Sequence, residues 1–320
     1  MNERTIDVFN GDADGLCALH QLRLVEPVES ELVTGPKRDI GLLQRVEAGT
    51  GDRVTVLDIA LSKNRVALDR LLAAGARVRY FDHHQPGDMP AHPNFEPHID
   101  TDASVCTSLL VNAYLHGRHL PWAVVAAFGD NLADSARAAA TPLHYSADRL
   151  AQLQSLGECL NYNGYGDTLD DLFFDPADLY RQLRPYADPF AFIAESPAYR
   201  TLKTGYAEDM ARAVAVRARE ERPSGRVFML PAEKWARRIS GVFGNALAVE
   251  APAQAHAVLT AKPDGGYVVS VRSPLAARSG ADELCSQFDT GGGRKGAAGI
   301  NHLPESELGR FLARFFDIYQ

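Results

Sequence analysis

The first 135 residues alternate between short β-branched or aromatic runs and longer segments with helical periodicity. The strand-like runs are residues 6–9, 31–34, 54–57 and 77–81. Helices are expected between and after them, at residues 16–22, 41–48, 63–74, 105–116 and 121–128. Strands that alternate with helices predict a parallel, right-handed βαβ sheet of the α/β class. Residues 86–97 contain four prolines and predict a loop after the fourth strand.

The rest of the chain divides into a helical part and a second α/β part. Residues 136–225 keep a helical period with short breaks. Beyond them, strands are predicted at residues 226–230, 256–260 and 267–271, with a helix at 233–249. We therefore expect a parallel-sheet N-terminal domain at residues 1–135, a helical extension and linker at 136–225, and a smaller α/β domain at 226–320.

Composition indicates a water-soluble globular protein. The 320 residues are 46% hydrophobic and 23% charged, which is ample for a core. No apolar run reaches the length of a membrane span, and no signal-peptide pattern precedes the first strand, so a cytoplasmic protein is expected. The four cysteines form no CxxC pair and are expected to be reduced packing residues: Cys17, Cys106, Cys159 and Cys285.

The net charge of −8 is unevenly distributed. Residues 226–320 carry 11 Lys and Arg against 9 Asp and Glu, whereas residues 1–225 carry 22 against 32. An acidic body repels a long polyanion unless metal ions neutralise it. The slightly basic C-terminal part is therefore the better candidate for holding an anionic substrate.

Polar, metal-competent side chains follow the predicted strands. They are Asp12 and Asp14 in the turn Asn10-Gly11-Asp12-Ala13-Asp14-Gly15, Asp58 after the third strand, the run Asp82-His83-His84 after the fourth, and Asp130 after an apolar helix. Carboxyl ends of parallel strands share one edge of a sheet, where open α/β sheets bind their ligands. Aspartate and histidine together suit divalent transition metals such as Mn²⁺ or Zn²⁺. The pattern predicts a metal site at this edge.

Each of these residues alone also has an ordinary interpretation. Asp12 could be a helix N-cap, because aspartate there satisfies free backbone N–H groups. Asp58 and Asp130 could be loop or capping residues. A calcium loop of the EF-hand type is excluded, because its twelfth position is Arg23 instead of glutamate. The metal interpretation is favoured because several such residues fall at one sheet edge.

A glycine-rich segment near the C-terminus predicts an anion site. Residues 291–299 read Gly-Gly-Gly-Arg-Lys-Gly-Ala-Ala-Gly, and Arg272-Ser273 follows a predicted strand. Glycines let backbone N–H groups converge on an anion, and the basic side chains complete a clamp. The alternative is a flexible surface loop. The segment is not a P-loop, since no Lys-Ser/Thr closes it.

These motifs resemble those of the DHH phosphoesterases and of the DHH-associated C-terminal domain. The resemblance rests on Asn10-Gly11-Asp12-Ala13-Asp14, Asp58, Asp82-His83-His84, Gly129-Asp130, Arg272-Ser273 and Gly291-Gly292-Gly293-Arg294, and it covers residues 5–135 and 226–303. The family includes bacterial oligoribonucleases, hydrolases of linear dinucleotides, RecJ single-strand exonucleases and family II inorganic pyrophosphatases.

The resemblance implies a metal centre with divided roles. Asp12 would bind one Mn²⁺ ion and Asp14 the other, Asp58 would bridge both, and His83 and Asp130 would be further ligands. The cofactor would be one or two Mn²⁺ ions, with Mg²⁺ or Co²⁺ as alternatives.

The resemblance also implies catalytic and substrate-binding roles. His84 would face the scissile phosphate, and Asp82 would orient the histidines. Arg272 and Arg294 would clamp a terminal phosphate, assisted by Ser273 and the backbone of Gly291, Gly292 and Gly293.

Two positions depart from the family pattern. Many relatives carry a histidine four residues before the first motif aspartate, where this chain has Val8. One metal site therefore lacks a ligand unless Asn10 or water replaces it. Relatives also commonly have histidine after the three glycines, where this chain has Arg294, which cannot act as a neutral acid–base group.

The resulting hypothesis is a metal-dependent phosphodiesterase that hydrolyses short oligonucleotides or linear dinucleotides to nucleoside monophosphates. One alternative is a RecJ-like single-strand exonuclease, and another is a catalytically silent nucleotide-binding protein, which the Val8 departure motivates. A pyrophosphatase fits less well, because the C-terminal part resembles the nucleic-acid branch. The role of residues 136–225 stays open between a lid, a homodimer face and packing.

Overall fold

The computed structural model describes residues 3–320 and divides into two compact units, Met1–Thr204 and Gly205–Gln320. The division falls inside helix α9 (Pro197–Val214). The first unit extends well past the predicted domain limit at residue 135. The three-part division into residues 1–135, 136–225 and 226–320 stays a prediction about domains.

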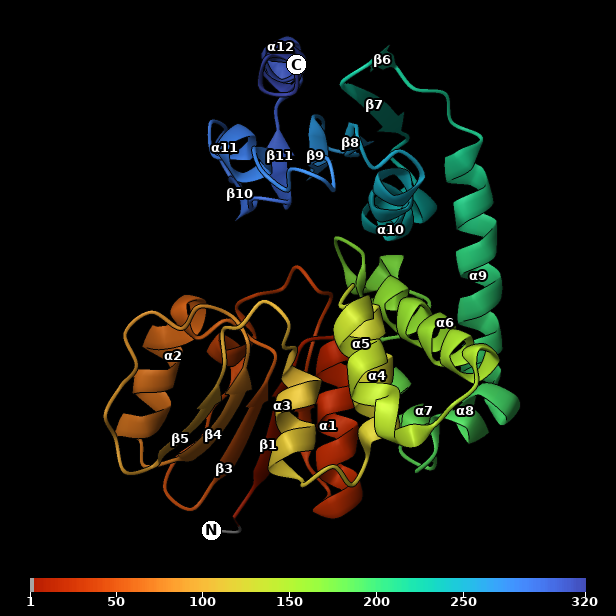
Figure 1. The fold of residues 1–320 in the computed structure, drawn as a ribbon. Helices are drawn as coiled ribbons and strands as arrows, with labels where there is room; N and C mark the ends of the chain where they lie inside the picture. The colour runs from red at the N-terminus through yellow and green to blue at the C-terminus, as the bar shows by residue number, and fades with distance from the viewer. Residues whose placement is uncertain (1–2) are drawn as a thin grey trace. The chain divides into compact units, whose positions relative to one another are not determined.

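The first unit contains a five-stranded sheet in which every strand pair is parallel, as predicted (Figure 1). The strand order is β2-β1-β3-β4-β5. Its strands are β1 (Thr5–Phe9), β2 (Glu31–Val33), β3 (Arg53–Leu57), β4 (Arg77–Asp82) and β5 (Phe95–Ile99). Strand β5 corrects the sequence analysis, which placed residues 86–97 in a loop. It is an edge strand, where a proline such as Pro97 is tolerated because one side of the strand needs no ladder hydrogen bonds.

Alternating side chains on these strands build a core on each face of the sheet. Val8 and Val56 pack on the face covered by α2 (Leu61–Ala73). Phe9, Leu57 and Phe81 point to the opposite face, which α1 (Ala13–Val25) and α3 (Thr107–Tyr114) cover (Figure 1). Because both faces are buried, the polar residues that end the strands gather at the edge.

The helices after α3 join the core of the first unit. They are α4 (Leu120–Gly129), α5 (Ala133–Ala140), α6 (Ala147–Gly164), α7 (Pro176–Leu183) and α8 (Pro189–Glu195). The 3-10 turns of the first unit are η1 (Leu42–Arg45), between β2 and β3, and η2 (Thr141–Leu143) and η3 (Leu169–Asp171), after α3. Helices α4 and α6 approach closely at Gly157, where a Cβ atom would lie 2.2 Å from the carbonyl oxygen of Val125. The helix predicted at residues 41–48 is only the turn η1, since Val46 already has extended backbone.

The second unit is built on a six-stranded mixed sheet of order β10-β11-β9-β8-β7-β6. Its elements are β6 (Glu220–Arg222), β7 (Gly225–Leu230), α10 (Lys234–Glu250), β8 (Ala255–Ala261), β9 (Tyr267–Arg272), α11 (Ala281–Cys285), β10 (Gly291–Arg294), β11 (Ala297–Leu303), η4 (Glu305–Glu307) and α12 (Leu308–Ile318). Phe243 of α10 packs on Phe228 at one face. Helices α11 and α12 cover the other face, where Phe311 and Phe315 are fully buried. The expected second α/β fold is confirmed.

Other expectations from composition can be compared with the structure. All four cysteines are buried and free of disulfides. Within residues 3–320, none of the helices combines the length and the apolar character that crossing a membrane requires.

Helix α1 carries a buried histidine that ties it to the chain after α7. The imidazole of His20 is 1% exposed, and its Nε2 donates to the carbonyl oxygen of Tyr186 at 2.8 Å. The edge of the ring packs against Trp122 with the ring centroids 4.7 Å apart. Burial lowers the pKa of His20 to about 4, because the charged form loses its hydration.

We predict that His20 makes the stability of the first unit fall in mild acid. Its pKa is lower in the folded state than the ordinary value of about 6.5, so stabilisation is present above that value and is lost as the pH falls toward 4. Between pH 8 and pH 5 the loss from this one group is about 2 kcal/mol. Urea unfolding of His20→Asn across this range should show a flatter pH profile. The control His144→Asn, at an exposed position, should keep the wild-type slope; a wild-type slope in His20→Asn would contradict the assignment.

Candidate metal centre

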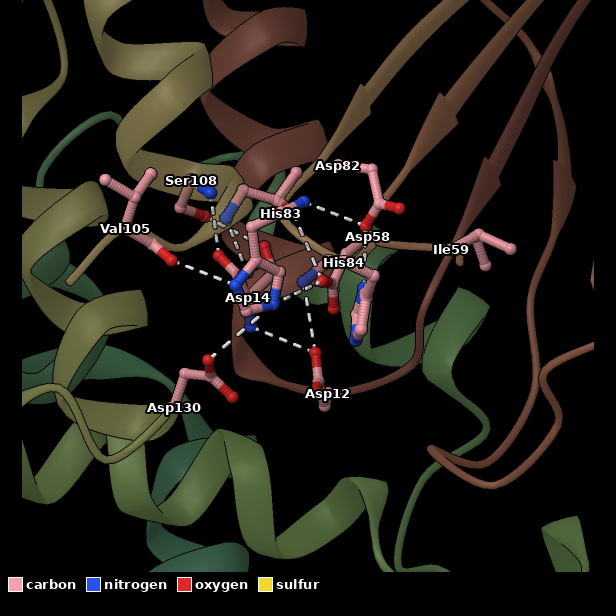
Figure 2. A network of polar contacts seen from close by, with 12 residues as sticks. Asp12, Asp14, Asp58, Ile59, Asp82, His83, His84, Val105, Ser108 and Asp130 are labelled. Carbon is pink, nitrogen blue, oxygen red and sulfur yellow. Dashed lines mark hydrogen bonds and ion pairs between the residues drawn. The ribbon is translucent and has the colours of Figure 1, made fainter. Parts of the chain in front are cut away.

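The residues predicted from the strand ends come together at the carboxyl edge of the first sheet. Figure 2 shows the side chains of Asp12, Asp14, Asp58, His83 and Asp130 converging on one another. They arrive from the ends of β1, β3, β4 and helix α4. Asp12, Asp14 and Asp58 are at most 3% exposed. The structure therefore gathers all five predicted ligands, while their roles stay predictions.

Asp12 is both a helix cap and a member of the site. Its Oδ1 accepts the N–H groups of Asp14 and Gly15, each at 3.1 Å, at the start of α1. Its Oδ2 accepts a hydrogen bond from Lys37 Nζ at 2.6 Å. Burial raises the pKa of Asp12, but the charge and hydrogen bond of Lys37, together with the hydrogen bonds from Gly15 and Asp58, outweigh it, so the pKa of Asp12 is lowered overall. The two interpretations of Asp12 are compatible, because each uses a different oxygen.

Asp14 is held by the N-terminus of another helix. Its two carboxylate oxygens accept the N–H groups of Thr107 and Ser108, at 2.8 and 2.7 Å, in the first turn of α3. A helix N-terminus favours negative charge. Burial and the neighbouring carboxylates Asp130 and Asp12 nevertheless raise the pKa of Asp14. The site thus carries more negative charge than its protein partners neutralise.

Asp58 sits directly after β3 in a left-handed backbone conformation with φ of 60°. Its N–H donates to the carbonyl of Phe81 at 3.0 Å, and its Oδ1 accepts from the hydroxyl of Thr107 at 3.1 Å. Burial, followed by the charges of Asp14 and Asp12, raises the pKa of Asp58 well above its ordinary range. A carboxylate in this environment is stabilised by a cation.

His83 presents one ring nitrogen to the carboxylates. Its Nδ1 lies 2.9 Å from the carbonyl oxygen of Val105, which can only accept, so Nδ1 carries the proton. Nε2 then offers a lone pair, 3.5 Å from Asp58 Oδ1 and 3.9 Å from Asp130 Oδ2. A histidine whose other nitrogen donates to a backbone carbonyl is the usual arrangement of a metal ligand.

Asp82 contacts both histidines, while its role in catalysis stays a prediction from the resemblance. Its Oδ1 accepts the backbone N–H of His83 at 2.9 Å and faces His84 Nδ1 at 2.7 Å. Asp82 is fully buried, whereas the His84 side chain is 35% exposed. Asp82 therefore orients His84 while the ring stays accessible from solvent.

Sequence reasoning missed Lys37, which lies inside the site. It follows β2 in the loop of residues 34–41, and its Nζ lies 3.4 Å from both Asp130 Oδ1 and Asn161 Oδ1, besides its contact with Asp12. The rule that identified the aspartates, a polar residue after the carboxyl end of a parallel strand, also applies to Lys37. Asn161, from α6, carries no comparable signal.

The donor set fits a divalent cation. Among the described residues, two groups of three side chains each have ligand atoms that lie within 4.8 Å of one another. One group is Asp58, His83 and His84, and the other is Asp14, His83 and Asp130. Carboxylate oxygens with imidazole nitrogen suit Mn²⁺, Fe²⁺ or Zn²⁺. The raised pKa values of Asp14 and Asp58 mark the uncompensated negative charge that such an ion would neutralise.

In the second unit, the two predicted clamp arginines share one level of the sheet. Ala297 of β11 pairs with Arg294 on one side and Arg272 on the other, and directly paired residues point to the same face. The Arg272 guanidinium donates to Asn245 Oδ1 at 2.6 Å, to Ser270 Oγ at 2.9 Å and to two backbone carbonyls. Arg272 is therefore held by protein contacts, while Arg294 is exposed. Their role as a clamp stays a prediction.

The glycine run forms a strand, which argues against the alternative of a flexible loop, while the anion site stays a prediction. Gly291–Arg294 form the edge strand β10, paired antiparallel with β11. A Cβ atom on Gly291 would lie 1.8 Å from the Cys285 carbonyl oxygen, and one on Gly293 would lie 2.5 Å from Ala298 Cα. Gly292 has open space. Close packing of the strand thus explains two of the three glycines. Ser273 supports the hairpin, since its hydroxyl donates to the carbonyl of Gly296 at 3.2 Å.

Solved structures with this fold match nearly the whole chain. A DHH-domain protein described as a member of a family of ribosomal proteins has a TM-score of 0.62 at 16% identity, over 98% of this chain and 86% of its own. The pGpG-specific phosphodiesterase PggH of Vibrio cholerae has a TM-score of 0.61 at 15% identity, over 99% of both chains. Exonuclease RecJ bound to manganese has a TM-score of 0.60 at 18% identity, over 98% of this chain and 89% of its own.

The fold is that of DHH-domain and RecJ-like proteins, which confirms the fold that the motif resemblance implies. No family model matches the sequence, and no curated protein matches it.

We predict that Mn²⁺ raises the melting temperature and that a chelator reverses the rise. An ion that binds only the folded state at 100 times its Kd stabilises by about 2.7 kcal/mol. The raised pKa of Asp58 means that the metal-free protein loses stability as pH rises through that pKa, so the Mn²⁺ effect should grow with pH. Thermal melts with and without Mn²⁺ measure it. His83→Ala should abolish the rise and the control His302→Ala should keep it; an equal rise in His83→Ala would contradict the assignment.

We predict that Gly293→Ala destabilises the second unit while Gly292→Ala does not. Gly293 has φ of 146° and its Cβ would meet backbone, so the loss should be about 1–3 kcal/mol. Gly292 has room, and its change should stay within about 0.5 kcal/mol. Urea unfolding of the full chain compares the two variants. Equal stabilities would refute the steric account of this strand.

Proposed function

We propose that this protein is a divalent-metal-dependent phosphodiesterase that hydrolyses short oligonucleotides or linear dinucleotides to nucleoside monophosphates. The observation that carries the proposal is the free Nε2 of His83 among buried carboxylates, with Nδ1 fixed by the Val105 carbonyl. These residues lie at the carboxyl edge of a parallel sheet, which is where α/β proteins bind their substrates.

The residues of the site divide the chemistry between them. A divalent cation, when bound, supplies Lewis acidity toward a phosphoryl oxygen. Asp14, Asp58, His83 and Asp130 are the residues that would hold it. His84, whose Nδ1 is held by Asp82 at 2.7 Å, can present Nε2 to the leaving oxygen for proton transfer.

The structural neighbours support this choice of reaction and of metal. One is described as a pGpG-specific phosphodiesterase and another as an exonuclease bound to manganese. RecJ of Thermus thermophilus is also described in complex with Mn²⁺. Mn²⁺ is therefore the first metal to test, with Mg²⁺ and Co²⁺ as alternatives.

Charge favours short substrates over long strands. Residues 1–225 carry 32 acidic against 22 basic residues, and a long nucleic acid would meet this repulsion over many phosphates. A dinucleotide or short oligomer brings few phosphates, which the metal centre can neutralise.

We predict turnover of pGpG, pApA or oligomers of three to five nucleotides in Mn²⁺, with nucleoside monophosphates as products. Asp58→Asn should lower the rate by more than about a hundredfold, since a bound metal contributes several kcal/mol of transition-state stabilisation. Asp134→Asn is the control, because its side chain is fully exposed in helix α5, four residues after Asp130. Chromatography of products measures both. No turnover of any of these substrates would refute the proposal, and turnover confined to long single strands would favour a RecJ-like exonuclease.

A further inference from the structure

Lys37 places a positive charge where the site would otherwise need a metal ion. Its Nζ lies 2.6 Å from Asp12 Oδ2 and 3.4 Å from both Asp130 Oδ1 and Asn161 Oδ1. An ammonium group has three N–H donors and no acceptor, so three surrounding oxygens match its hydrogen-bonding capacity. The carboxylate of Asp12 is therefore compensated by the chain itself.

Packing holds Lys37 in this position. Its backbone N–H donates to the carbonyl of Gly164 at 2.8 Å, and its Nζ lies 5.8 Å from the centre of the Tyr165 ring. Gly164 in turn lies against Asp12, since a Cβ atom on it would come within 3.0 Å of Asp12 Cα. The loop of Lys37, the end of α6 and the turn of Asp12 are thus in mutual contact. Lys37 is a built part of the site and not a mobile surface side chain.

Asp12 has little capacity left for a metal. Its Oδ1 already accepts two backbone N–H groups and its Oδ2 accepts Lys37. Asp12 belongs to neither group of potential ligands among residues 3–320. Val8 is fully buried in the core beside α2, so β1 adds no donor from that position.

The two groups of potential ligands depend on the same nitrogen. His83 belongs to both groups. Its Nδ1 is engaged with the Val105 carbonyl, which leaves only Nε2 for a metal. One lone pair on Nε2 binds one ion. The two groups therefore cannot both hold an ion through His83 at the same time.

We propose that Lys37 is a built-in cation that replaces one of the two metal ions expected from the motifs, so that the centre binds a single divalent ion at His83. This inference deepens the proposed function and rests on the same metal centre. Asp130 connects the two positive charges, because its Oδ1 faces Lys37 and its Oδ2 faces His83 Nε2 at 3.9 Å. The ammonium acts as a positioning and electrostatic group, fixed beside the ion that a substrate phosphate would meet.

The test is the number of Mn²⁺ ions bound by the full chain. Metal-free protein is titrated with MnCl₂, and bound manganese is counted by elemental analysis and by electron paramagnetic resonance. The expected result is one ion per chain with the spectrum of an isolated Mn²⁺. Two ions per chain with a spin-coupled spectrum would overturn the proposal, since metal pairs about 3.5–4 Å apart interact magnetically. Absence of bound Mn²⁺ would overturn it as well.

A charge-removing variant tests the replacement itself. Lys37→Met keeps the length of the side chain and removes the ammonium, so the count should rise above one at saturating Mn²⁺. The control Lys63→Met, at an exposed position on α2, should keep one ion. A count that stays at one in Lys37→Met would contradict the replacement. If Lys37→Met does not fold, the number of Mn²⁺ ions bound by the wild-type chain decides whether the proposal holds.

The number of Mn²⁺ ions bound per chain tests this inference separately from the proposed function, because counting the ions needs no substrate. One ion without hydrolysis of any substrate refutes the function and keeps the role of Lys37. Two ions with hydrolysis refutes the role of Lys37 and keeps the function.

Discussion

The structure of the first unit is organised around the burial of several carboxylates at one edge of a sheet. Like charges brought together away from water repel strongly unless dipoles or cations compensate them. Asp12 accepts N–H groups at the start of α1, and Asp14 accepts them at the start of α3. Lys37 adds a full positive charge. The charge that remains is centred on Asp58, where the structure points the open nitrogen of His83.

Most of this site could be predicted because its residues follow strands. The alternation of strand-like and helical segments predicts a parallel sheet, and a parallel sheet brings the ends of its strands together. Asp58 and the Asp82-His83-His84 run needed no further information. Lys37 satisfies the same rule but was not recognised, because a lone lysine after a short strand is ordinarily a solvated surface residue. Asn161 was beyond such reasoning, since it belongs to helix α6, far along the chain from Lys37, which it contacts.

The second unit shows packing requirements that residue chemistry alone does not reveal. Three glycines beside two basic residues predict an anion site, which stays a prediction. Two of these glycines also allow an edge strand to pack closely. Glycine is required at these positions because a side chain would collide with the Cys285 carbonyl or the Ala298 backbone. No local sequence pattern reveals these neighbours. The paired register that sets Arg272 and Arg294 at one level likewise depends on β11, a strand that the sequence analysis did not place.

The central claim is that a single divalent ion binds at His83 while Lys37 compensates Asp12. Anomalous diffraction at the manganese edge, from crystals of the full chain grown with Mn²⁺, tests it most directly. The account predicts one anomalous peak beside His83 Nε2, with the Lys37 ammonium still on Asp12. Two peaks flanking Asp58 with Lys37 displaced from Asp12, or no peak at His83, would contradict it.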